Sequence, residues 1–335
     1  MLRFLRVSLN TARFLRPHTR AQRLTNMGPL RLCIIPVAVC LAQAPFRVDV
    51  KLVNVSFAVR DSRGVLIPNL DRDDFEVFED GVPQKIAFFA RTTDLPLTLG
   101  LIVDASGSQK HFVKQHYHDL EKFLKRTLTE RDRAFLVCFG NRLRLVQDYS
   151  TEPKELMEAL HDFEKDKHHR RDFPELGPPE RRILGTAFYD ALVHPIAERL
   201  SSAEPGSKAL IVFSDGEDNS SAHHMLDAIE AAQSADVRIF ALRYTEDDHG
   251  RLNARNKYGI SVMARLAHET GGVDFDAREK DLATHFQEIG DDLRSSYGLA
   301  YHSTNAAREA SFHNIVIKPK QPGLTVRAKT GYFIH

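Results

Sequence analysis

The chain has 335 residues, 42% of them hydrophobic, and its 46 Lys and Arg residues nearly balance 45 Asp and Glu residues. This length suits one medium domain with a smaller second one. A formal net charge of +1 argues against bulk nucleic-acid binding, and 18 Gly and 15 Pro residues are too few for a fibrous or largely disordered chain.

The N-terminal segment differs in composition from the rest. Residues 1–45 contain several arginines and no acidic residue, followed within the segment by an apolar run at 32–42. This run is shorter than the roughly 20 residues that cross a bilayer as a helix. It fits the apolar core of a secretory signal, so we expect a leader, an exported chain (periplasm, cell surface or secreted) and no integral membrane span in the mature part. Met27 is an alternative start, and an organellar transit peptide is the alternative interpretation.

Two segments with β-strand patterns flank the middle of the chain. Residues 46–93 show near-alternation of apolar positions and an Asp80-Gly81 hairpin signal, and residues 296–335 carry further strand patterns. Neither flank has enough strands to be stable alone. We therefore predict that the two flanks pair into one small antiparallel β-sandwich-like domain. Two unrelated extensions are the alternative.

Residues 94–295 show strands alternating with helices. Nearly continuous apolar runs lie at 97–103, 134–139, 209–213 and 237–242. Such runs are typical of strands buried on both faces. Segments with helical apolar stripes separate them. This alternation predicts an α/β domain with a doubly wound, mostly parallel, Rossmann-like sheet. We expect the segment 142–147 to form an antiparallel strand at the edge of this sheet. The α/β domain would then be inserted between the two flanks.

Polar side chains follow two of the buried runs. Asp104, Ser106 and Ser108 come directly after the first run, and Asp215 follows the third. In open α/β sheets, ligands bind at the carboxyl ends of the strands. A helix start at Thr186 adds a hydroxyl, and this set of hard oxygen donors favours Mg²⁺, with Mn²⁺ or Ca²⁺ as alternatives, over zinc. Taken alone, Asp-x-Ser-x-Ser also fits a helix N-cap.

In this order and context, Asp104-x-Ser106-x-Ser108, Thr186 and Asp215 resemble the metal-ion-dependent adhesion site (MIDAS) of von Willebrand factor type A (vWA) domains. The resemblance implies that these five residues hold a divalent cation, directly or through water. Neutral hydroxyls leave Mg²⁺ under-neutralised, so an Asp or Glu of a protein partner is a favourable last ligand.

The flanks look similar to those of a bacterial subgroup, the acidobacterial-type vWA-related proteins. Asp74-Phe-Glu-Val-Phe-Glu-Asp-Gly81 is the signature before the α/β domain, and Arg327-Ala-Lys-Thr-Gly-Tyr332 is the one after it. The resemblance implies an exported, metal-dependent protein-binding or adhesion module rather than an enzyme. The sequence shows no Gly-x-Ser-x-Gly or phosphate-loop motif. A metal-dependent hydrolase and a structural envelope protein are the alternatives.

Other polar residues near these segments have simpler expected roles. Asp190 is expected to support the Thr186 loop rather than to bind the ion. Residues 217–219 could tune the rim of this site, but a solvated acidic turn is the simpler expectation, and His223 with His224 are expected to lie on solvated surface.

Overall fold

A computed structural model describes residues 52–106, 117–165, 172–178, 185–245, 251–278, 281–305 and 311–334, all within one compact unit. The predicted leader and Ser108 lie outside these ranges. Across the described part of the chain, every helix is too short or too polar to cross a bilayer.

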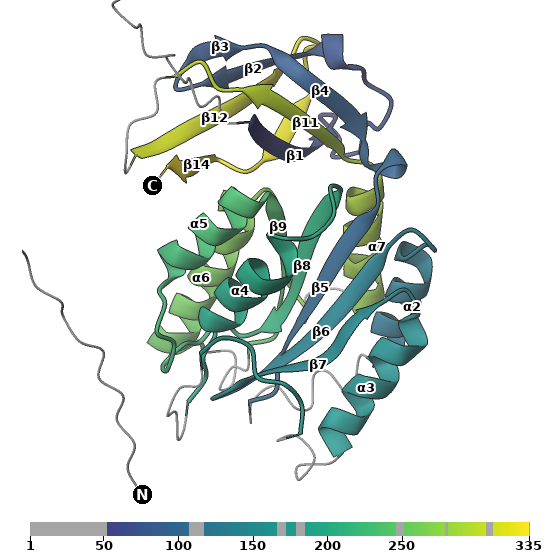
Figure 1. The fold of residues 1–335 in the computed structure, drawn as a ribbon, viewed down its shortest axis with the longest axis vertical. Helices are drawn as coiled ribbons and strands as arrows, with labels where there is room; N and C mark the ends of the chain where they lie inside the picture. The colour runs from purple at the N-terminus through teal and green to yellow at the C-terminus, as the bar shows by residue number, and fades with distance from the viewer. Residues whose placement is uncertain are drawn as a thin grey trace, which may run out of the picture. The chain divides into compact units, whose positions relative to one another are not determined.

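A six-stranded sheet forms the centre of the α/β domain, in the order β10-β9-β8-β5-β6-β7 (Figure 1). Its strands are β5 (Leu97–Asp104), β6 (Arg133–Phe139), β7 (Leu143–Ser150), β8 (Ser207–Ser214), β9 (Val237–Arg243) and β10 (Asp274–Asp276). All neighbours pair in parallel except β6 and β7, which are antiparallel. The predicted mostly parallel sheet and its antiparallel edge are therefore confirmed.

Helices cover both faces of this sheet (Figure 1). They are α2 (Tyr117–Thr127), α3 (Pro153–Lys165), α4 (Asp190–Pro195), its π-helical continuation η4 (Ile196–Leu200), α5 (Met225–Ala235), α6 (Ala254–Glu269) and α7 (Leu282–Arg294). Leu99 and Leu101 of β5 pack in one core with α2, α3 and α7, whereas Ile102 packs in a second core with α4, α5 and α6. Every residue of β5 is buried, as its uninterrupted apolar run predicts.

The flanks form two four-stranded sheets, ordered β13-β1-β11-β4 and β14-β12-β2-β3. Before the α/β domain lie β1 (Leu52–Arg60), β2 (Phe75–Glu79), β3 (Val82–Gln84) and β4 (Ile86–Arg91), with the 3₁₀ turns η1 (Arg72–Asp74) and η2 (Thr92–Asp94). After it lie β11 (Tyr297–His302), β12 (Ser311–Pro319), β13 (Thr325–Ala328) and β14 (Gly331–Ile334). Each sheet combines strands of both flanks, as the predicted insertion requires. One shared core, which contains Phe57, Phe75 and Tyr297, lies between them.

The two flank signatures meet at the buried carboxyl group of Glu79. Its Oε2 accepts hydrogen bonds from the hydroxyls of Tyr332, at 3.1 Å, and Tyr301, at 2.7 Å. Its Oε1 accepts from Ser303 and Asn305 at 2.6 and 2.9 Å. Four donors use the full acceptor capacity of a carboxylate. The two signatures, more than 250 positions apart by number, therefore share one buried hydrogen-bonding centre.

A buried cluster of charged residues joins the sandwich to α7. The Asp292 side chain is 1% exposed and pairs with Arg238 of β9 at 2.8 Å, Arg60 of β1 at 3.1 Å and Arg327 of β13. Burial alone would raise the pKa of Asp292, but the positive charges of Arg238, Arg327 and Arg60 outweigh it and hold the pKa below its usual value.

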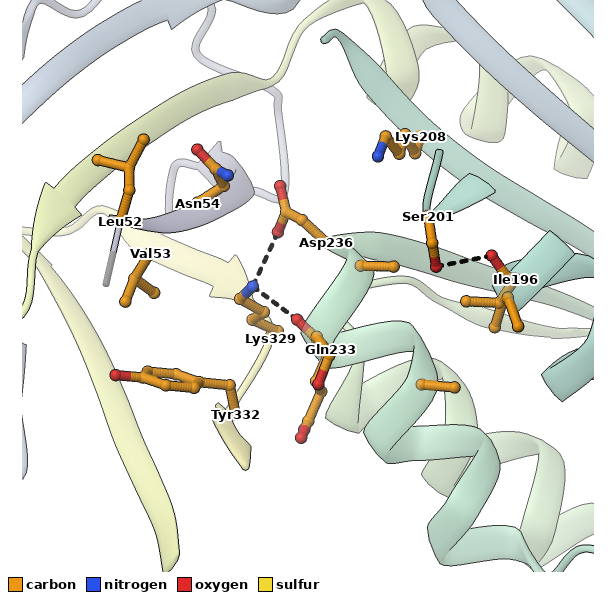
Figure 2. A pocket seen from close by; sticks show the side chains of 14 residues that line it. Leu52, Val53, Asn54, Ile196, Ser201, Lys208, Gln233, Asp236, Lys329 and Tyr332 are labelled. Carbon is orange, nitrogen blue, oxygen red and sulfur yellow. Dashed lines mark hydrogen bonds and ion pairs between the residues drawn. The ribbon is translucent and has the colours of Figure 1, made fainter. Parts of the chain in front are cut away.

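A second ion pair joins the sandwich to the end of α5, beside a cavity of about 450 Å³ (Figure 2). Asp236 has a left-handed backbone, with φ of 54°, and ends α5. Its carboxylate pairs with Lys329 Nζ at 3.2 Å and accepts the Ser56 hydroxyl at 2.8 Å. Lys329 also donates to the carbonyl of Gln233 at 2.8 Å. The Arg327-to-Tyr332 signature thus contacts both the α/β domain and the sandwich.

Asp292→Ala should lower the free energy of unfolding by about 3–5 kcal/mol, because it leaves buried arginines without their counter-charge. Urea unfolding followed by circular dichroism measures the loss. Asp291→Ala is the matched control, since Asp291 pairs with Arg126 with side chains 45% and 58% exposed. That surface pair should contribute no more than about 1 kcal/mol. Equal losses in the two variants would contradict the prediction.

Candidate metal site

Asp104 lies at the carboxyl end of β5, next to the end of β8. The two strands are parallel, with Val103 opposite Phe213, so Asp104 and Ser214 end neighbouring strands at the same edge of the sheet. The Ser214 hydroxyl donates to Asp104 Oδ2 at 2.8 Å, and the Ser106 backbone amide donates to Asp104 Oδ1 at 2.9 Å. These bonds hold the carboxyl group in one orientation.

The Asp104 carboxyl group is almost fully buried, at 1% exposure. Burial raises its pKa to about 6, and the negative charge of Asp215 adds to the increase. Hydrogen bonds from Ser106 and Ser214 act in the opposite direction and do not offset it. An ionised Asp104 therefore costs folding free energy at neutral pH, and a cation beside it would reduce that cost.

Asp215 begins a tight turn after β8. Its side chain is 8% exposed, and its Oδ1 accepts the backbone amide of Glu217 at 3.0 Å. Gly216 has φ of 78°, and a Cβ at this position would come within 2.6 Å of the Gly259 carbonyl oxygen in α6. Only glycine fits both the left-handed backbone and this close approach. The turn is thereby held against α6, which keeps Asp215 at the sheet edge.

Thr186 is bound to the same loop through its backbone. Asn219 Oδ1 accepts the Thr186 amide at 2.7 Å, and the Thr186 carbonyl accepts the amides of Asn219 and Ser220 at 3.1 and 3.2 Å. Asp218 Oδ1 accepts the Phe188 amide at 2.8 Å. The turn at these positions faces solvent in part, as expected, but the side chains of Asp218 and Asn219 also link two loops. These contacts give hydrogen-bond acceptors to backbone amides of the two loops that would otherwise have none within a helix or strand.

Asp190 supports the same junction from the start of α4. Its carboxylate is fully buried and accepts the backbone amides of Ala222 and His223, each at 3.0 Å. This agrees with the supporting role expected for Asp190. The His223 ring also contacts it, with Nδ1 at 2.7 Å from Asp190 Oδ1. His223 is thus a partly exposed residue that also contacts the buried Asp190, a contact that the sequence did not indicate.

The structure places Asp104, Ser106 and Asp215 at one edge of the sheet and connects Thr186 to the loop that carries Asp215. Asp104 and Asp215 are buried, whereas Ser106 and Thr186 are partly exposed. Ser108 lies outside the described residues. The donors are carboxyl and hydroxyl oxygens, which fit a hard cation such as Mg²⁺. Their role as metal ligands stays a prediction.

The contacts by which Ser214, Asp218 and Asn219 shape this edge were not predicted from the sequence. Ser214 is fully buried, donates to Asp104 and accepts the Gly216 amide at 3.1 Å. Its position directly before Asp215, at the end of a buried strand, was a usable signal. Asp218 and Asn219 gave no comparable signal, because their partners lie about 30 residues earlier in the chain.

No family model matches the chain, and no curated protein matches it. Similar solved structures include an aerotolerance-related membrane protein from Bacteroides fragilis, with a TM-score of 0.42 and 14% identity over 59% of this chain and 98% of that one. BatB from Bacteroides thetaiotaomicron has a TM-score of 0.42 and 13% identity over 59% and 97% of the two chains.

A third similar structure is proximal thread matrix protein 1 from the mussel byssus, with a zinc-occupied MIDAS motif. It has a TM-score of 0.46 and 16% identity over 65% of this chain and 50% of that one. A doubly wound sheet with Asp104 and Asp215 at the ends of neighbouring parallel strands fits the vWA-type fold that the sequence resemblance implies.

Asp104→Asn should change how stability depends on pH. Between pH about 4 and about 6, Asp104 of the wild-type chain keeps its proton in the folded state, whereas in the unfolded state it has lost it, because folding raises its pKa. The metal-free protein should therefore lose stability as pH rises through this window, by up to about 3 kcal/mol. The asparagine variant lacks this titration, so its stability relative to wild type should rise over the same window and level off above it.

Urea unfolding in EDTA at several pH values between 4 and 7.5 measures this difference. Asp73→Asn is the control, because the Asp73 side chain is 90% exposed and its stability difference from wild type should be nearly independent of pH. A flat difference for Asp104→Asn as well would show that Asp104 is not a buried titrating group.

Proposed function

We propose that this protein is a metal-dependent protein-binding module. Asp104, Ser106 and Asp215, with Thr186 and Ser108, would hold a divalent cation, Mg²⁺ by preference. When bound, the cation would supply a positive centre with an open coordination position for an Asp or Glu side chain of a protein partner. The observation that carries the proposal is the convergence of oxygen-bearing segments at the ends of β5 and β8.

The hydrogen bonds around these segments support the proposal. Ser214 and the Ser106 amide orient Asp104, and the Glu217 amide orients Asp215. Such bonds to the ligand side chains are typical of protein metal sites, where they fix ligand orientation. The links from Asp218 and Asn219 hold the Thr186 segment against the loop that carries Asp215. The oxygen donors are therefore largely pre-positioned by the protein itself.

We propose a binding role rather than catalysis. The sequence carries no Gly-x-Ser-x-Gly or phosphate-loop motif, and Ser214, whose hydroxyl donates to Asp104, is fully buried and so is not exposed to a substrate. A protein ligand that completes the coordination of the cation needs no reacting group. We further propose that the mature protein acts outside the cytoplasm, which rests on the arginine-rich, acid-free leader and its apolar run.

Mg²⁺ should bind the wild-type chain and raise its melting temperature, whereas Asp104→Ala should bind Mg²⁺ at least about tenfold more weakly and show no such increase. Isothermal titration calorimetry and thermal unfolding with and without EDTA measure both effects. Asp73→Ala is the control for loss of an exposed carboxylate. Circular dichroism establishes that the variants are folded.

Binding of a partner is tested by affinity capture from an envelope extract of the source organism, with and without EDTA. Wild type and Asp73→Ala should retain a protein that Asp104→Ala and the EDTA-treated sample do not. Undiminished capture by Asp104→Ala in EDTA would rule out a metal-mediated contact. Mg²⁺ binding that alters stability but no capture would favour a purely structural ion.

A further inference from the structure

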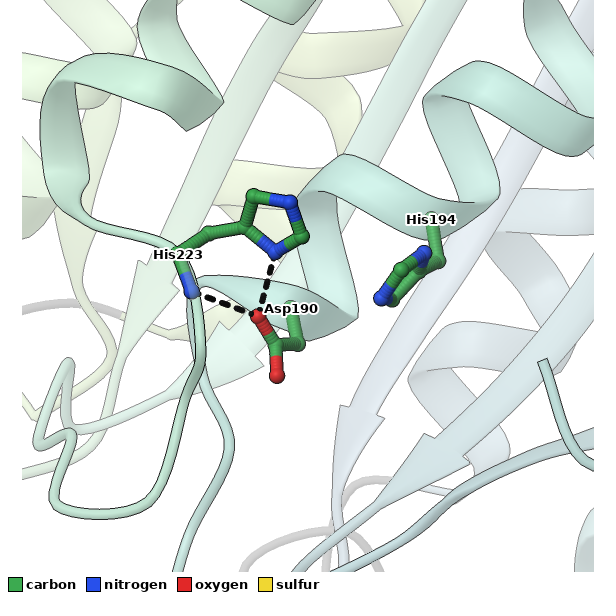
Figure 3. A group of neighbouring side chains, drawn as sticks. All are labelled: Asp190, His194 and His223. Atoms are coloured by element: carbon green, nitrogen blue, oxygen red, sulfur yellow. Dashed lines mark hydrogen bonds and ion pairs between the residues drawn. The ribbon is translucent and has the colours of Figure 1, made fainter. Parts of the chain in front are cut away.

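We propose that Asp190, His194 and His223 form a second metal site, which takes a Zn²⁺-like transition-metal ion rather than Mg²⁺. One candidate ligand atom from each residue lies within 4.8 Å of the other two. Figure 3 shows Asp190 and His194 on α4 and His223 on the loop before α5. The set is separate from the oxygen donors at the ends of β5 and β8.

The geometry of helix α4 allows Asp190 and His194 to bind the same ion. Asp190 and His194 are four positions apart on α4 and therefore lie on the same face of the helix. The same spacing places pairs of ligands on one helix face in zinc enzymes. The third ligand, His223, already contacts Asp190, with Nδ1 at 2.7 Å from Oδ1. The two imidazole rings lie 5.2 Å apart between centroids.

Small side-chain movements would bring the three atoms to bonding distance. Ligands of a tetrahedral Zn²⁺ at bond lengths of about 2.0–2.1 Å lie about 3.4 Å from one another. The largest spacing in the cluster, at most 4.8 Å, must therefore shorten by no more than about 1.4 Å. Rotation of the His223 side chain, which is 34% exposed, can supply much of this movement.

The surroundings of His194 resemble the support that metal-binding histidines receive. Its Nδ1 lies 3.9 Å from Glu198 Oε1, one helical turn further along, too far for a hydrogen bond, but a small shift would let this carboxylate orient the ring as carboxylates do beside metal-binding histidines. Glu198 is itself held by the Gly177 amide at 2.8 Å. The ring packs so closely on Gly177 that a Cβ there would come within 2.6 Å of it. The His194 ring therefore has little freedom to turn away.

The chemistry of the ligands decides which ion fits. Two imidazole nitrogens and one carboxylate suit Zn²⁺ and related transition metals, whereas Mg²⁺ prefers oxygen alone. Three protein ligands leave a fourth position open, and partly exposed His223 places it toward solvent. A bound ion would tie α4 to the loop of residues 218–224, which also positions Thr186 through Asn219.

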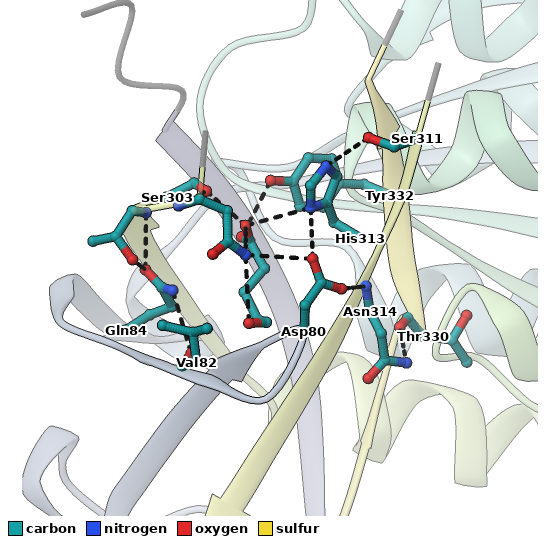
Figure 4. Close-up of polar contacts among 12 residues, drawn as sticks. Asp80, Val82, Gln84, Ser303, Ser311, His313, Asn314, Thr330 and Tyr332 are labelled. Atoms are coloured by element: carbon teal, nitrogen blue, oxygen red, sulfur yellow. Dashed lines mark hydrogen bonds and ion pairs between the residues drawn. The ribbon is translucent and has the colours of Figure 1, made fainter. Parts of the chain in front are cut away.

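A similar cluster in the sandwich, formed by Glu79, Asp80 and His313, has no such need of an ion. Both oxygens of Glu79 are occupied by hydroxyl and amide donors that are not candidate ligands. Asp80 accepts the Asn314 amide at 2.8 Å and pairs with His313 Nδ1 at 2.8 Å (Figure 4). A metal ion here would have to displace bonds from residues that are not candidate ligands, whereas at Asp190 it would replace the side-chain contact with His223, which is itself a proposed ligand.

The test is calorimetric titration of Zn²⁺ into the EDTA-treated and dialysed full chain, with a competing chelator to suppress weak surface sites. Wild type should bind one Zn²⁺ at this site, and His194→Ala and His223→Ala should each bind it at least about tenfold more weakly. His224→Ala, which removes the neighbouring exposed histidine, and Asp104→Ala should bind Zn²⁺ like wild type.

Zinc affinity equal to wild type in His194→Ala or in His223→Ala would overturn the proposal. So would a loss of equal size in His224→Ala, because it would indicate binding by surface histidines in general. Should His223→Ala fail to fold, His194→Ala decides the question, since Asp190 keeps its bonds to the amides of Ala222 and His223 in that variant. Unchanged Zn²⁺ binding in Asp104→Ala separates this site from the proposed Mg²⁺ site.

Discussion

The parallel pairing of β5 with β8 places two carboxyl groups, Asp104 and Asp215, at the same buried edge of the sheet, and much of the α/β domain is arranged around that constraint. Burial raises the pKa of Asp104, and the negative charge of Asp215 adds to the increase. Local hydrogen bonds from Ser214 and from backbone amides reduce the cost without removing it. A site that holds acidic groups in this way is less stable than a neutral one at pH 7. Natural proteins tolerate such costs where a ligand offsets them, and a divalent cation is the ligand that this donor set fits.

The loop of residues 214–224 connects the features of the site. Near its start it carries Asp215, in its middle Asp218 and Asn219 bond to the backbone around Thr186, and near its end His223 contacts Asp190. The proposed Mg²⁺ and Zn²⁺ sites therefore share one loop while using different donors, oxygen in the first and mainly imidazole in the second. An ion at either site would restrict the same loop. The binding of Mg²⁺ and the binding of Zn²⁺ should therefore be measured separately before the binding of a protein partner is studied.

The sandwich is joined to the α/β domain by charged groups that are buried rather than displayed on the surface. Asp292 forms ion pairs with three arginines, which lie on β9, β1 and β13, and Asp236 pairs with Lys329 at the end of α5. Removing one partner from such a group leaves uncompensated buried charge, so each member strongly constrains the others. Within the sandwich, Glu79 and Tyr332 connect the strands before the α/β domain with those after it. The flanks thus act as one platform although the α/β domain separates them in the chain.

The sequence alone determined the elements whose signals are local. Continuous apolar runs identified the buried strands of the sheet, the alternation of strands and helices identified its class, and the positions of Asp104 and Asp215 after two such strands identified the candidate edge. The tertiary structure decided which distant side chains meet. Asn219 with Thr186, His223 with Asp190, and Asp292 with its arginines are contacts between segments far apart in the chain. Such contacts depend on how loops and helices pack, and the periodicity of a single segment reports only which of its faces is buried.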